Sequence, residues 1–298
     1  MRNVCAHSIL SSKDMKIIKS FTSTLVSLLL LSGCHGCKPK GQEMEKKSIK
    51  VGVIAGPETL LMEKIKDIAE SEEGLIIEII QFNDYMTPNI ALHDKSIDAN
   101  SFQHEPYLNE MVRSRGFKLV AAGPTFIYPL AAYSKKIRHA KDLAFNAKVA
   151  IPNDPTNESR ALRLLEKQGL IELKAGKGHL YQASDIIKNP MDLKLVELEA
   201  AQLPRALDDV DIAIINTTFA SAAGLNPQHD GLFMEGADSP YVNIVAVREE
   251  DKDADWVKKL MKAIHHDKVK QAALEIFKGS VLPGWRTEGT GDGGLKDD

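Results

Sequence analysis

Cysteine is nearly absent from this chain, and neither charge sign is in excess. The three cysteines are Cys5, Cys34 and Cys37. Cys34 and Cys37 have the C-x-x-C spacing of redox and zinc sites, but no βαβ unit surrounds them and no second ligand pair lies nearby, which disfavours either use. Lys and Arg total 38 against 41 Asp and Glu, for a formal net charge of −3. This balance gives no indication of a nucleic-acid partner or of a disordered chain.

Signatures of catalysis and of metal binding are also missing. The sequence has no GxSxG elbow, no P-loop, no GxGxxG after a strand and no HExxH motif. His104 has no second histidine or carboxylate at metal-ligand spacing. The acidic run Asp208 to Asp211 lacks EF-hand spacing and is typical of a solvated turn. We therefore expect a protein that is not an enzyme and that holds neither a metal nor a cofactor.

No apolar run in the sequence is long enough to cross a membrane. The longest mostly apolar stretch lies near the N-terminus. Residues 21–31 form a mostly apolar stretch after three lysines, too short for a transmembrane helix, which needs about 20 residues, but suited to a signal peptide. The stretch ends in Leu31-Ser32-Gly33-Cys34, which resembles the bacterial lipobox. This pattern predicts a lipoprotein signal peptide over residues 1–33, lipidation of Cys34 and a polar tether over 34–48.

The rest of the chain alternates apolar strands with amphipathic helices. Strands are predicted at 49–56 and 75–82 around a helix that contains Leu60 to Ala69, which makes a βαβ unit and implies a parallel sheet. A second α/β set is expected to begin after a crossover at residues 135–146, and a single amphipathic helix is predicted over 253–277. Residues 286–298 are rich in Gly and charge and predict a disordered tail.

These elements predict two α/β lobes on an exported, lipid-tethered chain. We assign residues 49–134 and 241–285 to the first lobe and residues 135–240 to the second. Two lobes on a hinge can close over a small molecule and exclude water from it. The predicted fold class is therefore a two-lobed periplasmic-binding-protein-like fold of type 2, with two mixed sheets flanked by helices and a hinge of two crossings.

One stretch, residues 149–165, indicates a ligand site. A short apolar strand ends at Ile151, a polar turn with two prolines follows, and a helix begins with Thr156 and Asn157 as good N-cap residues. Unpaired backbone N–H groups at a helix N-terminus bind small anions, and Arg160 is placed to clamp a carboxylate. An ordinary strand-to-helix connection with a surface arginine is the alternative that this stretch leaves open.

Several long motifs resemble the NlpA/MetQ family of methionine-binding lipoproteins, which feed MetNI-type ABC transporters. The matching stretches are VGVIAGPE, FNDYMTPNIAL, IDANSFQHEPYL, GFKLVAAGPTFIYPLAAYSKKI, AIPNDPTNESRAL, LVELEAAQLPRALDDVDIAIINTTFA, AGLNP and GADSPYVNIVAVRE. They span about Lys50 to Trp285. The chain departs from the family pattern at Glu158 and Ser159, where relatives often have smaller residues, and at Glu105, where a lysine is common.

The resemblance implies a set of ligand residues. The methionine side chain would lie among aromatic rings and an imidazole, supplied by Tyr85, Phe102, His104 and Tyr107. The ligand carboxylate would meet Arg160, and the head group would be bound by Asn216, Asn243 and Asn153. A thioether gains from aromatic contacts, and buried asparagines need polar partners, so residue chemistry agrees with this assignment. Without the resemblance, an ordinary core position would be favoured for the aromatic residues, and a surface or core position for His104.

The implied function is a substrate-binding lipoprotein of an ABC importer, anchored by lipid in the bacterial cell envelope, most simply facing the periplasm. It would capture L-methionine and deliver it to a MetNI-like permease and ATPase. D-methionine, a methionyl dipeptide or another small amino acid are alternative ligands. A surface lipoprotein that contacts a partner is an alternative of a different class.

Overall fold

The computed structural model describes residues 48–285 except residues 177, 179 and 237. The predicted signal peptide, the lipidation site Cys34, all but Ser48 of the tether, and the tail over 286–298 lie outside the described residues. Within the described part of the chain, no helix combines the length and the apolar character needed to cross a membrane.

A six-stranded mixed sheet forms the centre of the first lobe, in the order β13-β4-β12-β3-β1-β2. Strand β1 is parallel to β2 and β3, whereas β12 runs antiparallel to both of its neighbours, β3 and β4. The strands are β1 (Ser48–Ile54), β2 (Ile76–Phe82), β3 (Ala99–His104), β4 (Leu119–Ile127), β12 (Val242–Arg248) and β13 (Leu282–Pro283).

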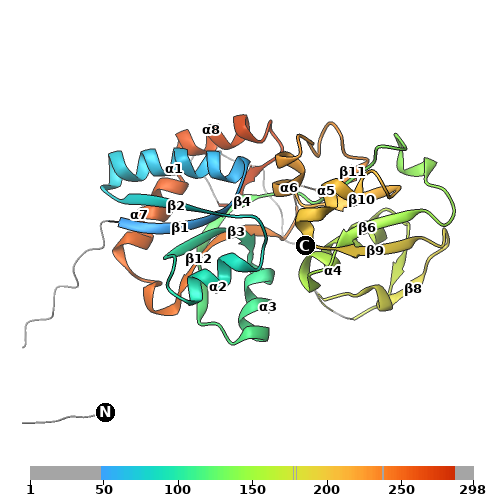
Figure 1. The fold of residues 1–298 in the computed structure, drawn as a ribbon, viewed down its shortest axis with the longest axis horizontal. Helices are drawn as coiled ribbons and strands as arrows, with labels where there is room; N and C mark the ends of the chain where they lie inside the picture. The colour runs from blue at the N-terminus through green and yellow to red at the C-terminus, as the bar shows by residue number, and fades with distance from the viewer. Residues whose placement is uncertain (1–47, 177, 179, 237, 286–298) are drawn as a thin grey trace, which may run out of the picture. The chain divides into compact units, whose positions relative to one another are not determined.

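Helices cover both faces of this sheet (Figure 1). Helices α1 (Pro57–Glu73), α7 (Asp255–Ile264) and α8 (Asp267–Ile276) bury their apolar residues on one face, while α2 (Thr87–His93) and α3 (Glu105–Arg115) pack on the other. Helix α1 begins with Pro57 at its first position and ends at Gly74 in a left-handed conformation, a usual pairing of start and stop residues.

A five-stranded mixed sheet forms the centre of the second lobe, in the order β11-β5-β10-β6-β9. Helix α4 (Pro155–Lys167) covers one face, and α5 (Leu203–Ala206) and α6 (Thr217–Ala222) cover the other. The strands are β5 (Ala131–Tyr133), β6 (Lys148–Pro152), β9 (Lys194–Leu198), β10 (Ile212–Ile215) and β11 (Phe233–Met234). A separate pair consists of β7 (Glu172–Leu173) and β8 (Ile186–Lys188), and short 3₁₀ turns are η1 (Ala140–Asp142), η2 (Ala183–Asp185), η3 (Ala200–Gln202) and η4 (Glu249–Asp251).

The chain passes between the sheets twice. The first crossing is residues 128–130, because β4 belongs to the six-stranded sheet and β5 pairs with β10 in the other. The second crossing is residues 235–241, between β11 and β12. The crossover expected at residues 135–146 is therefore placed too late, since this segment follows β5 and contains the turn η1.

Two local predictions were wrong for reasons of capping. Helix α4 is capped by Asp154, whose carboxylate accepts the Asn157 backbone N–H at 2.9 Å, so Thr156 and Asn157 lie inside the helix. The single helix predicted over 253–277 is two helices, which break at His265 and His266. The His266 imidazole accepts the Lys268 N–H at 3.1 Å and starts α8, while the apolar pattern continues across the break.

Candidate functional site

A small cavity lies where the two lobes meet. Its lining comes from the loop after β2, from β3, α3, the first crossing, α4, the start of α6, and β12. The lining residues are Tyr85, Phe102, Gln103, His104, Tyr107, Tyr128, Asn157, Arg160, Asn216, Thr217, Thr218 and Asn243. Loops and termini beyond strand ends are the usual place for ligands in open α/β sheets.

One end of the cavity is an aromatic box. The Tyr85 ring centroid lies 5.6 Å from that of Phe102, 6.2 Å from Tyr107 and 4.8 Å from Phe219 of the other lobe. The Tyr107 hydroxyl donates to the Tyr85 carbonyl at 2.9 Å, which fixes the loop that carries Tyr85. Offset and edge contacts of this kind leave apolar ring edges available to an apolar, polarisable group.

A buried network of three side-chain amides holds together the two elements next to this box, α2 and β3. Asn89 and Gln103 exchange hydrogen bonds at 2.8 and 2.7 Å, and Asn100 donates to Asn89 at 2.9 Å. The network joins α2, which follows the Tyr85 loop, to β3, which carries Phe102 and His104. All three amides are fully or nearly fully buried, so their mutual pairing is what makes this polar cluster compatible with the core.

His104 is neutral, and its tautomer follows from its contacts. Its Nδ1 accepts the Tyr107 backbone N–H at 3.2 Å as the N-cap of α3, so the proton lies on Nε2. Nε2 is 3.2 Å from Oδ1 of Asn157 and therefore donates to it across the two lobes. Burial, together with the nearby Arg160 charge, lowers the pKa of His104 to about 3.

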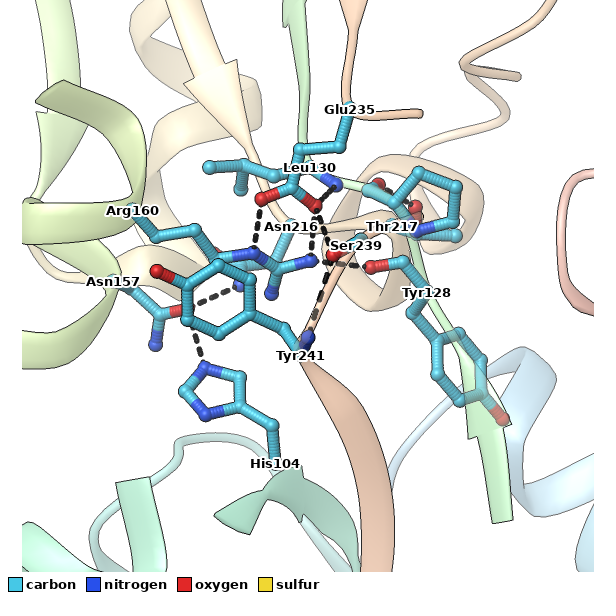
Figure 2. A network of polar contacts seen from close by, with 11 residues as sticks. His104, Tyr128, Leu130, Asn157, Arg160, Asn216, Thr217, Glu235, Ser239 and Tyr241 are labelled. Atoms are coloured by element: carbon cyan, nitrogen blue, oxygen red, sulfur yellow. Dashed lines mark hydrogen bonds and ion pairs between the residues drawn. The ribbon is translucent and has the colours of Figure 1, made fainter. Parts of the chain in front are cut away.

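Asn157 links this imidazole to Asn216 (Figure 2). Its Oδ1 accepts from both His104 and the Asn216 amide, the latter at 2.9 Å, and its own amide donates to the Asp154 carboxylate. The other amide atom of Asn216, Oδ1, is buried and has no hydrogen-bond partner among the described residues. A buried acceptor in a cavity wall without a donor calls for one from a ligand or from water.

Arg160 is buried and points into the same region from α4. Its Nε and Nη2 form a bidentate ion pair with Glu235 at 2.7 and 2.5 Å, and Nη2 also donates to the Tyr128 carbonyl at 2.7 Å. The guanidinium carbon lies 4.6 Å from the centre of the Tyr241 ring. Burial alone would lower the pKa of Arg160, but the Glu235 carboxylate outweighs burial and the pKa is raised, so Arg160 keeps its positive charge.

The cavity brings together all but one of the residues proposed from the sequence. Tyr85, Phe102, His104, Tyr107, Arg160, Asn216 and Asn243 all line it. Asn153 does not: its side chain is exposed, and its backbone N–H donates to the Leu198 carbonyl at the end of the β6–β9 pairing.

Sequence reasoning missed several lining residues. Asn157 lies one helical turn before Arg160 on the same face of α4, a spacing that was available as a signal. Glu235 had no local signal, because it acts through Arg160 from 75 residues further along the chain. The other lining residues that were not predicted are Gln103, Tyr128, Thr217 and Thr218.

Two α/β lobes that enclose a small cavity with an aromatic end and a charged, amide-rich end define a solute-binding protein. The family model for NlpA lipoprotein matches residues 49–285. The chain belongs to the NlpA lipoprotein family. It is 50% identical to the D-methionine-binding lipoproteins MetQ of Salmonella typhimurium and of Escherichia coli K12, over 88% of this chain and 95% of each relative.

Solved structures agree in fold. A nutrient-binding protein from Burkholderia cenocepacia, solved bound to methionine, is 50% identical, with a TM-score of 0.78 over 80% of this chain and all of that one. An ABC transporter periplasmic substrate-binding protein from Coxiella burnetii is 52% identical, with a TM-score of 0.78 over 79% of this chain and all of that one. The predicted two-lobed fold class is confirmed by these neighbours.

Proposed function

We propose that this lipoprotein captures methionine in the cavity between its lobes and passes it to an ABC importer. The observation that carries the proposal is the division of the cavity into two chemistries. Arg160 offers a charged donor, Asn216 Oδ1 is an acceptor without a partner, and the aromatic box lies in the same cavity. An α-amino acid with a soft apolar side chain supplies the matching carboxylate, ammonium and thioether.

The lining of the cavity supports a single amino acid, because it offers one arginine at its polar end and one aromatic box for a side chain. The methionine in the Burkholderia cenocepacia structure supports methionine as the ligand, and the names of the relatives specify D-methionine. We propose the L form, with D-methionine as the alternative.

The wider assignment is proposed on the same grounds. Delivery would be to a permease and ATPase of the MetNI type, with Cys34 as the lipid attachment site and the binding lobes facing the periplasm. Binding and release are conformational, so the proposal includes no covalent step and no cofactor. The site residues proposed to touch the ligand are Tyr85, Phe102, His104, Tyr107, Asn157, Arg160, Asn216 and Asn243.

The test is thermal unfolding of the full chain against a panel of ligands. Any co-purified ligand is first removed by unfolding and refolding. A ligand that binds only the folded state raises the melting temperature with the logarithm of its concentration over Kd. We expect L-methionine to give the largest shift, ahead of D-methionine, leucine and methionyl dipeptides. If no amino acid raises the melting temperature, the proposed function is wrong, and a surface lipoprotein that contacts a partner is the remaining alternative.

A further inference from the structure

Glu235 lies outside the cavity lining, yet it is the residue that Arg160 contacts most. It follows β11 in the second crossing, and its side chain is 11% exposed, against 3% for Arg160. Its Oε1 accepts from Arg160 Nε, while its Oε2 accepts from Arg160 Nη2, from the Leu130 backbone N–H at 2.9 Å and from the Ser239 hydroxyl at 3.3 Å. A carboxylate this enclosed and this fully bonded is held in one place.

These contacts leave the arginine a single free edge. Nε and Nη2 are occupied by Glu235 and the Tyr128 carbonyl, and the Tyr241 ring covers one face of the guanidinium. Nη1 has no protein partner among the described residues. Figure 2 shows this third nitrogen turned away from Glu235, on the side where Asn157 and His104 lie. A ligand carboxylate therefore meets one predetermined donor rather than a mobile side chain.

Glu235 also sets the charge that the ligand encounters. An unpaired buried guanidinium would favour any anion strongly, whereas the Arg160–Glu235 pair has no net charge. Of the other carboxylates near the cavity, Asp154 is engaged by the Asn157 N–H and amide at the start of α4, and Glu58 by the Thr218 hydroxyl. His104 adds no positive charge. A net-neutral arginine pair suits a net-neutral zwitterion better than a simple anion.

We propose that Glu235 positions Arg160 and sets the ligand preference of this site, an inference that rests on the proposed function. It fixes the free edge of Arg160 toward the ligand carboxylate, and it balances the arginine charge so that an amino acid is preferred over the anion of the same shape that lacks the ammonium group. The Arg160–Glu235 pair is hydrogen-bonded to both crossings, to Tyr128 and Leu130 in the first and to Ser239 in the second.

The test compares L-methionine with 2-hydroxy-4-(methylthio)butanoate, which has a hydroxyl in place of the ammonium. Affinities are measured by competition titration on the full chain. Glu235→Gln removes the charge and nearly keeps the shape. We expect the preference for methionine over the hydroxy acid to fall at least about tenfold. Both ligands carry the carboxylate and only methionine carries the ammonium, so the loss of the Glu235 charge weakens methionine relative to the hydroxy acid.

Asp98→Asn is the matched control. Asp98 pairs with Arg248 in the first lobe, with side-chain exposures of 15% and 10%, and neither residue lines the cavity. This variant loses a comparably buried acidic partner of an arginine, so a general loss of stability would appear in both. We expect it to keep the wild-type ligand preference. An unchanged preference in Glu235→Gln, or an equal change in Asp98→Asn, overturns the inference.

Glu235→Asp keeps the inference testable if the glutamine variant does not fold. Aspartate keeps the charge but is one methylene shorter, so it cannot hold both arginine nitrogens as glutamate does. Both ligands should weaken at least about fivefold while their ratio stays at the wild-type value, and wild-type affinities would refute the positioning role. If the wild-type chain binds no methionine, the proposed function itself has failed, which is a different result from a bound ligand with unchanged preference.

Discussion

A buried glutamate at the lobe interface predicts an unusual pH dependence of stability. Glu58 lies in the first turn of α1 and is 5% exposed. Its Oε1 accepts the hydroxyl of Thr218 in the other lobe at 2.6 Å, whereas its Oε2 is buried without a partner among the described residues. Burial raises the pKa of Glu58 from 4.5 to about 8, although the Thr218 hydrogen bond lowers it in part.

The size of the effect follows from linkage between protonation and folding. The folded protein holds the Glu58 proton more tightly than the unfolded chain does. The associated stability is therefore fully present below pH 4.5 and is lost as the pH rises through 8. At roughly 1.4 kcal/mol per pKa unit, the loss is about 3 kcal/mol at pH 7 and about 5 kcal/mol well above pH 8.

Glu58→Gln removes the ionisation and keeps a side chain of nearly the same shape. We expect the variant to be only slightly more stable than wild type at pH 5 and about 3 kcal/mol more stable at pH 7, with a further gain at pH 8.5. Guanidinium unfolding at these three pH values measures the difference. Glu63→Gln is the control, because Glu63 is an exposed residue of the same helix.

Parallel curves would refute this reasoning. If the wild type and Glu58→Gln differ by a constant amount at every pH, Glu58 is not protonated by burial in the folded state. The unpaired oxygen would then have to be hydrated, and the lobe contact through Thr218 would be an ordinary carboxylate hydrogen bond. A change of the same size in the Glu63→Gln control would equally contradict a local cause.

Three further predictions concern the site and the core. Asn157→Ala deprives His104 and Asn216 of their shared acceptor and should weaken methionine binding by about 1–3 kcal/mol in calorimetry; wild-type affinity would remove Asn157 from the site. The pKa of His104 is lowered to about 3, so its contribution to stability is present above about pH 6.5 and is lost as the pH falls toward 3. His104→Gln should therefore lose less stability than wild type between pH 7 and 4.5, measured by urea unfolding. Leu260→Ala, in the fully buried face of α7, should cost about 2–5 kcal/mol in the same assay, and a cost under 1 kcal/mol would contradict the packing described.

The fold class could be predicted from the sequence because the spacing of apolar residues and the turn residues determine strands and helices locally. The strands predicted at 49–56 and 75–82 correspond to β1 and β2, and the family motifs pointed to the aromatic box and to Arg160. Local reasoning failed where a cap decided the outcome. The Asp154 cap starts α4 two to three residues earlier than expected, so Asn157 is a cavity residue inside the helix and not its cap. His266 divides the C-terminal helix within an unbroken apolar pattern.

Contacts between distant parts of the chain were beyond sequence reasoning. Glu235 and Arg160 are 75 residues apart, and Glu58 and Thr218 are 160 apart. No period or spacing links such residues, since their meeting depends on how the two sheets are joined. The exposed position of Asn153 was equally hidden, because a polar residue in a turn after a strand faces a ligand or solvent according to the exact path of that turn.

The place of β12 in the first sheet has a consequence for how the chain acquires its structure. This strand lies between β3 and β4, although it is made more than a hundred residues after them. The second lobe is complete in one continuous stretch and can form as soon as that stretch is available. The first lobe has to wait, with a gap in the middle of its sheet, until residues 242–248 arrive. In a chain still being made, residues 48–127 thus lack the strand that completes their sheet, and the cavity, which Asn243 helps to line, is among the last features to be assembled.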